Sequence, residues 1–199
     1  MSSPTTSDIA LVRRGKRLEW ATLGWNVVGV LVLAWLALAS SSVALLGFGL
    51  NSLIEIGAST VVLWELSGSG EERQRRALRL IGVAFVAFAC YLFAQSLVAL
   101  VTGHHATPSA GGIAWTGITA VVMFALALGK RRTGLALGNP VLVAEGKVTT
   151  VDGILALAVL VGVTLDLAFG LWWADPLAGI VIATYAAREA VTIFGPRRL

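Results

Sequence analysis

Two carboxylates lie deep inside long apolar stretches of this 199-residue chain, Glu55 in one stretch and Asp152 in another. We expect one end of each stretch to lie at the same face of the membrane. Counted from that end, each carboxylate is about eleven or twelve residues into its stretch. Equal counts predict equal depth, close to the bilayer midplane, where a carboxylate costs about 2.5–3.5 kcal/mol. Two unpaired carboxylates that face each other would also repel, and a bound cation removes that penalty. The pair therefore predicts a cation site.

Neighbouring polar residues extend this set of oxygen donors. Asn51 precedes Glu55 by four residues, so its amide lies on the same helical face. Thr149 precedes Asp152 by three residues, and its hydroxyl is a further candidate ligand. The four side chains offer only oxygen, which suits hard divalent cations such as Mn²⁺ or Mg²⁺. The alternative is that Asn51 and Glu55 form hydrogen bonds between helices and hold a bundle together.

Other polar residues in these stretches have different expected roles. Glu145, two turns before the second carboxylate, either lines an approach from the cytoplasm or reaches from the interface toward water. We expect Glu19 and Glu65 to be solvated near the cytoplasmic boundary and Asn26 to form a hydrogen bond between helices. No Lys or Arg is expected at the depth of the carboxylates. The nearest is Lys147, about 7–8 Å toward the cytoplasm.

The elements that must position these residues are six apolar segments. Hydrophobic residues make up 57% of the chain and charged residues 13%, with a mean hydropathy of +0.83, which excludes a soluble globular enzyme, a disordered regulator and a secreted disulfide scaffold. The segments are continuously apolar rather than alternating, which favours helices over a β-barrel. We predict an all-α polytopic membrane protein with six transmembrane helices, approximately at 20–39, 43–66, 77–101, 112–129, 140–169 and 173–194.

Basic residues predict the orientation of these helices. All 15 Lys and Arg fall before the first segment, between the second and third, around the junction of the fourth and fifth, or near the C-terminus. The positive-inside rule then predicts both termini in the cytoplasm and a place in the cytoplasmic membrane. Anionic lipid headgroups, rather than nucleic acid, explain the net charge of +4. We expect a cytoplasmic tail over 1–18, a transmembrane domain over 19–195 and no C-terminal soluble domain.

Local signals predict where two of the helices begin and where one of them packs. Asn139 before Pro140 predicts the start of the fifth helix, and Asp175 before Pro176 predicts the N-cap of the sixth. Small residues recur at four-residue spacing in the last segment and would let another helix approach closely: Gly179, Ala183 and Ala187.

Two stretches resemble the cation diffusion facilitator family. Residues 49–56 (Gly-Leu-Asn-Ser-Leu-Ile-Glu-Ile), running on to 61–64, resemble its helix 2, and residues 173–179 (Trp-Ala-Asp-Pro-Leu-Ala-Gly) are similar to the start of its helix 6. Residues 144–152 lie where the family has its helix 5 metal motif. The resemblance implies a dimeric, proton-coupled exporter of divalent metals with two ligands four apart in helix 2 and two in helix 5. The corresponding positions are Asn51, Glu55, Val148 and Asp152.

Departures from the family pattern shape the expected function. Asn51 replaces the usual Asp or His, and Val148 has no ligating atom. Asn with carboxylates resembles the manganese-type branch more than the zinc type. We expect a divalent metal cation transporter, a homodimer in lipid, that exchanges Mn²⁺ or Zn²⁺ for protons by alternating access and holds no resident cofactor. The alternative is a non-transporting metal-binding or interaction subunit. The chain carries none of the usual catalytic motifs, so we expect no enzyme.

Overall fold

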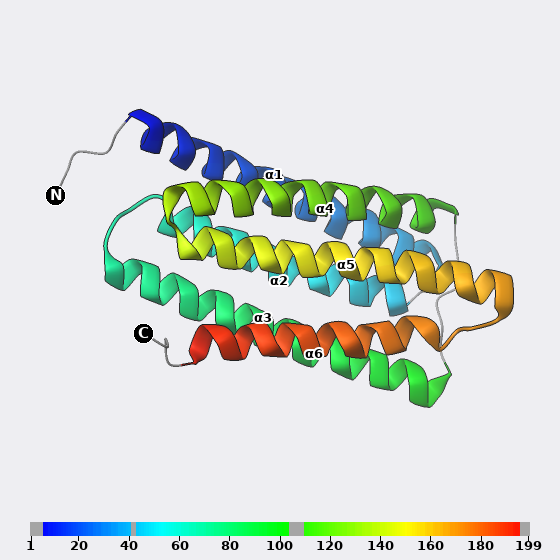
Figure 1. Cartoon of the computed structure of the whole chain (residues 1–199). Coiled ribbons are helices and arrows are strands. Elements are labelled where there is room, and N and C mark those ends of the chain that lie inside the picture. Colours follow the sequence, from blue (N-terminus) through cyan, green and yellow to red (C-terminus); the bar gives the residue numbers. More distant parts are fainter. Residues whose placement is uncertain (1–5, 41–42, 104–109, 196–199) are drawn as a thin grey trace.

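Six α-helices make up the fold (Figure 1). The structure is a computed structural model that describes residues 6–40, 43–103 and 110–195. Over these residues the chain contains helices and no strands, which confirms the all-α prediction. The helices are α1 (Thr6–Ser40), α2 (Val43–Glu65), α3 (Glu71–Thr102), α4 (Ala110–Leu137), α5 (Pro140–Phe169) and α6 (Ala174–Phe194).

The described helices have the lengths and surfaces of membrane spans. Five stretches are long and apolar enough to cross a bilayer: Asp8–Trp35, Glu71–Thr102, Ile113–Leu137, Pro140–Asp166 and Pro176–Phe194. Large apolar side chains point outward, with Trp35, Val121 and Val181 exposed by 69%, 71% and 69%. An apolar outer surface is what contact with lipid tails requires. The count of six spans and the cytoplasmic position of the termini remain predictions.

The basic segments gather at one end of the bundle. Figure 1 shows that α1 begins and α6 ends at the same end, at the left of the view, and the α2–α3 and α4–α5 connections lie there too. We call this the basic end.

Three helices extend beyond their predicted apolar segments at the basic end. α1 begins at Thr6 rather than near residue 20, α3 begins at Glu71 rather than near residue 77, and α4 continues to Leu137 rather than ending near residue 129. The added residues include Lys and Arg, which are good helix formers although they are not apolar. Hydropathy therefore predicts the apolar part of a helix, whereas the helix itself continues beyond that part.

The start of α5 is capped as predicted. The Asn139 side-chain oxygen accepts hydrogen bonds from the backbone N–H groups of Val141 (2.9 Å) and Leu142 (3.0 Å), and Pro140 opens the helix. The Asn139 amide donates to both carboxylate oxygens of Glu65, at 3.0 and 3.2 Å. Glu65 is only 7% exposed, so the expectation that it is solvated was wrong. The cap thus ties the end of α2 to the start of α5.

The N-cap predicted for α6 was wrong. The helix already includes Ala174, and Trp173 occupies the N-cap position, so Asp175 lies within the first turn. A helix that begins two residues earlier than its Asp-Pro signal still tolerates Pro176, because the first four N–H groups have no partner within the helix.

The two central helices are α2 and α5. α2 packs against α1, α3 and α5, and α5 packs against α2, α3, α4 and α6. α6 approaches α3 closely at Gly179, where an added Cβ would collide with the Ser96 hydroxyl. Ala183 is also buried, whereas Ala187 is exposed. The small-residue stripe therefore serves packing within the chain at two of its three positions.

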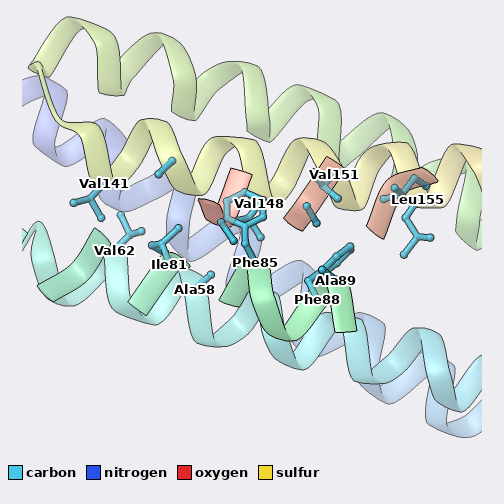
Figure 2. Close-up of a cluster of buried hydrophobic side chains, with 14 of the residues drawn as sticks. Ala58, Val62, Ile81, Phe85, Phe88, Ala89, Val141, Val148, Val151 and Leu155 are labelled. Carbon is cyan, nitrogen blue, oxygen red and sulfur yellow. The ribbon is translucent and has the colours of Figure 1, made fainter. Parts of the chain in front are cut away.

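An apolar cluster fills the space between α2, α3, α5 and α6 (Figure 2). Its larger members include Val62 of α2, Phe85 and Phe88 of α3 and Val151 of α5, all at most 2% exposed. No residue of α1 or α4 belongs to this cluster as far as the described side chains define it. The space that α1 and α4 share with α2 and α5 holds the polar residues instead.

Candidate metal site

Three of the four predicted site residues meet between α2 and α5. Asn51 and Glu55 lie one turn apart on α2 and are each 1% exposed, and Asp152 of α5 is 3% exposed. The Asn51 amide nitrogen donates a hydrogen bond to Asp152 Oδ1. The carboxyl groups of Glu55 and Asp152 are close enough to interact directly. We call this group of three residues the deep site.

A fourth side chain, from α1, completes the wall of the deep site. The Asn26 amide nitrogen donates to Glu55 Oε2 at 3.3 Å and to the Thr22 carbonyl oxygen at 3.0 Å. The hydrogen bond to Glu55 joins α1 to α2, as predicted for Asn26. This hydrogen bond uses Glu55 Oε2 and leaves Glu55 Oε1 without a hydrogen-bond partner.

Two oxygens of the deep site have no hydrogen-bond partner. They are Asn51 Oδ1 and Glu55 Oε1, and both are buried. An unsatisfied buried acceptor costs about 1–3 kcal/mol, so a native interior rarely retains two together without a reason. An amide oxygen and carboxylate oxygens are the donors that hard divalent cations take. The chemistry of the donor set therefore fits a divalent cation as a transported substrate.

The set is smaller than a complete metal site. Among the residues that the structure describes, no group of three or more His, Cys, Asp or Glu side chains is arranged to hold a metal ion. The deep site offers two carboxylates and one amide, so a cation there would take its remaining ligands from water.

Val148, one turn before Asp152, faces away from the deep site. It is 2% exposed and belongs to the apolar cluster together with Phe85. Figure 2 shows Val148, Val151 and Leu155 on the face of α5 that looks toward α3. Position 148, where the family has a helix 5 ligand, is thus part of the hydrophobic packing. This explains how a residue without a donor atom is accommodated there.

Thr149 joins a different polar group from the one predicted. Its hydroxyl accepts a hydrogen bond from Lys130 Nζ at 3.0 Å and donates to Glu145 Oε1 at 3.2 Å. Neither partner belongs to the deep site. The structure therefore brings Asn51, Glu55 and Asp152 together and leaves Thr149 about one turn away on α5.

A buried lysine was missed by the sequence reasoning. Lys130 Nζ lies 2.7 Å from Glu145 Oε1 and 3.2 Å from Glu19 Oε2, and all three side chains are 0% exposed. The expectation that Glu19 is solvated was wrong, and the sequence had not predicted Lys130 inside the bundle. Lys130 lies seven residues before the end of α4, so its side chain points between the helices rather than into a loop.

One available signal pointed to this group. Glu19 and Glu145 lie seven residues, about two turns, before Asn26 and Asp152, on the same faces of α1 and α5. A matched pair of buried acidic residues on two helices favours a cation between them, and in the structure Lys130 of α4 supplies it. Glu145 is 0% exposed, so the interpretation that it reaches from the interface toward water was wrong, and its place along a cytoplasmic approach stays a prediction.

Comparison with protein families identifies the membrane domain. Residues 80–196, more than half of the chain, match the cation efflux transmembrane domain. The chain belongs to this family. The match begins within α3, so it includes Val148 and Asp152 and does not extend to the α2 residues of the deep site. A search among curated proteins gave no match.

Membership of the cation efflux family supports several of the sequence-based predictions. It agrees with the resemblance seen in residues 173–179 and with apolar helices that cross a membrane several times. It supports transport of a metal cation rather than catalysis as the family's activity.

Proposed function

We propose that this chain moves divalent cations across the cytoplasmic membrane in exchange for protons, with Glu55 and Asp152 as the charged ligands. The observation that carries the proposal is the meeting of these two buried carboxylates beside Asn51 at the centre of the bundle. Two carboxylates balance the charge of one divalent cation. The unpaired oxygens Asn51 Oδ1 and Glu55 Oε1 supply acceptors that no protein group uses.

Proton exchange follows from the same geometry. Without a cation, two facing carboxylates repel each other, and a shared proton relieves the repulsion. A cation must displace that proton, because ligating carboxylates are deprotonated. Metal and proton then occupy the site in turn, which is the requirement for antiport. No further titratable ligand is needed for this coupling.

The donor set favours Mn²⁺ as the cargo. Amide and carboxylate oxygens suit hard cations, whereas Zn²⁺ is more often bound by sulfur and nitrogen ligands together with carboxylates. Zn²⁺ is the second candidate, since carboxylate oxygens also ligate it. We propose export from the cytoplasm, with the basic end facing inward, and a homodimeric assembly in lipid.

Alternating access would use the two central helices. α2 and α5 carry the ligands and pack against all four other helices between them. A rocking motion of either helix would change the exposure of the deep site to the two sides of the membrane.

The second candidate function is metal binding without transport. Val148 favours it, because this residue is locked in the apolar cluster and leaves the deep site with three protein ligands. A site with fewer ligands binds more weakly, and a partner chain would then carry the transport.

Flux into proteoliposomes tests the proposal. We expect Mn²⁺ uptake driven by a proton gradient for the wild type and uptake at the level of empty vesicles for Glu55→Gln, which removes one charge and keeps the shape. Glu71→Gln is the matched control, because its carboxylate is 93% exposed at the start of α3 and takes no part in the site. Equal uptake by wild type and Glu55→Gln would contradict the proposal. Isothermal titration of Mn²⁺ that detects binding without flux would support the second candidate.

A further inference from the structure

The charge cluster around Lys130 lies between the deep site and the basic end. Lys130 Nζ has three partners, Glu145 Oε1 at 2.7 Å, Thr149 Oγ1 at 3.0 Å and Glu19 Oε2 at 3.2 Å. The contacts with Glu145 and Thr149 are hydrogen bonds, whereas the contact with Glu19 is an ion pair without hydrogen-bond geometry. The ammonium group of Lys130 thus lies between carboxyl groups of α1 and α5.

The cluster contains more negative than positive charge. Two carboxyl groups share one ammonium group, and a carboxylate left uncompensated is costly where all three side chains are 0% exposed. Both carboxyl oxygens of Glu19 and Glu145 Oε2 are buried and have no hydrogen-bond partner. The Ser59 hydroxyl donates to Glu145 Oε1 at 3.2 Å. Around Lys130 Nζ the protein thus assembles two carboxylates and two hydroxyls, a richer oxygen set than that of the deep site.

The position of the cluster relates it to the deep site. Glu145 precedes Asp152 by seven residues on α5, and Glu19 precedes Asn26 by seven on α1, so about 10 Å along the helix axes separates the two levels. The Lys130 charge also interacts with Glu55. A cation that moves through the interior from the basic end therefore meets the cluster before it meets the deep site.

We propose that Glu19, Glu145, Ser59 and Thr149 form a second divalent-cation site, which Lys130 fills with its own ammonium group. A cation on its way to the deep site displaces the ammonium from the two carboxylates, and Lys130 returns when the cation has passed. Lys130 is a tethered competitor that keeps the cluster closed to metal. The passage step rests on the proposed function, whereas the existence of the second site does not.

A purely structural ion pair would behave differently from a tethered competitor. An ion pair that only joins α1, α4 and α5 creates no new metal site when the lysine is removed. A competitor that is removed leaves its site open. The number of metal ions bound per chain separates the two roles, and protein stability alone does not.

Equilibrium dialysis of Mn²⁺ against the purified full-length protein in micelles tests the proposal. We expect Lys130→Met to bind one more Mn²⁺ per chain than the wild type, and the additional Glu145→Gln substitution to abolish that gain. Lys147→Met is the matched control on α5, because Lys147 is 43% exposed and pairs with Glu189 outside the cluster. We expect it to bind as the wild type does. A folded Lys130→Met variant that binds no more Mn²⁺ than the wild type would overturn the proposal.

The result also separates this proposal from the proposed function. A wild type that binds no Mn²⁺, with Lys130→Met binding one ion, would support the second site and contradict the deep site. If Lys130→Met does not fold, Lys130→Gln gives the answer, because it removes the charge and keeps a hydrogen-bond donor in the cluster. We expect this variant also to bind one more Mn²⁺ per chain than the wild type. Binding equal to that of the wild type would overturn the proposal.

Discussion

The buried charged residues and the main apolar cluster lie in different halves of the bundle. Between α2, α3, α5 and α6 the buried residues form one apolar cluster that includes Phe85 and Val148. Between α1, α2, α4 and α5 they include Glu19, Glu55 and Lys130, all at most 1% exposed. α5 belongs to both halves, since it presents Val148 to one and Asp152 to the other. The same helix therefore serves packing on one face and chemistry on the other.

From this difference we predict that the apolar half stabilises the fold and that the polar half would bind ions. Hydrophobic packing against α3 needs no hydrogen-bond partners and tolerates no charge. The polar half retains unpaired acceptors at two levels, which a protein selected only for stability would have replaced by apolar residues. Substitutions in the two halves should therefore affect different properties.

Phe85→Ala should have the largest effect, a loss of unfolding free energy in the apolar half. Removing a buried aromatic side chain leaves a cavity and costs about 3–5 kcal/mol of unfolding free energy, measured by denaturant titration in micelles. Mn²⁺ affinity of the folded fraction should stay as in the wild type. Phe93→Ala on the same helix is the control, because Phe93 is 51% exposed and should cost little. A loss of affinity equal to that of a site variant would break the distinction.

Asp152→Asn should have the opposite profile. Losing one of two charged ligands weakens Mn²⁺ binding by about 100-fold or more, because a unit charge a few ångströms away is worth several kcal/mol in a protein interior. The unfolding free energy should stay the same or rise, since a buried charge is removed. Titration calorimetry and denaturant titration check the two parts. A variant that unfolds while keeping its affinity would refute this assignment of roles.

Gly179→Ala should destabilise the α3–α6 contact by about 1–3 kcal/mol. The added methyl group collides with the Ser96 hydroxyl, so the helices must separate. Gly57→Ala on α2 is the control, because a Cβ there meets nothing within 4 Å. Thermal unfolding of both variants in the same micelles is the measurement. Equal melting temperatures would show that the close approach contributes nothing.

Acid should weaken metal binding at the deep site by a smaller factor. Between about pH 7.5 and 5.5 we expect Mn²⁺ affinity to fall about tenfold, because protons compete with the cation for Glu55 and Asp152. The sign is fixed by the ligands, which bind metal only when deprotonated. Asp152→Asn should flatten the dependence. An affinity that is independent of pH in the wild type would contradict proton exchange.

Much of the fold could be predicted from apolar runs and local signals. The bounds of α2 and α5 agree with their predicted segments within one residue, and the Asn139 cap lies as expected. Counting residues from one membrane face brought Glu55 and Asp152 to a common level. These features depend on the number of residues between positions on one helix, which can be counted in the amino-acid sequence.

The positions of Lys130 and Thr149 were not predicted, because they depend on the direction in which side chains point. Lys130, Arg131 and Arg132 are adjacent in sequence, yet only Lys130 is buried, because successive residues on a helix turn by about 100°. Hydropathy places all three near a boundary and cannot separate them. Thr149 was assigned to Asp152 by spacing, but the buried ammonium one turn away attracts its hydroxyl more strongly. Tertiary partners decide such cases, and here the decisive partner comes from α4.

The central claim is that the deep site binds a divalent cation. Anomalous scattering from crystals of the full chain grown with Mn²⁺ tests it most directly. We expect an anomalous peak within coordination distance of carboxylate oxygens of both Glu55 and Asp152 and of Asn51 Oδ1. A structure at saturating Mn²⁺ with no peak between these side chains would contradict it.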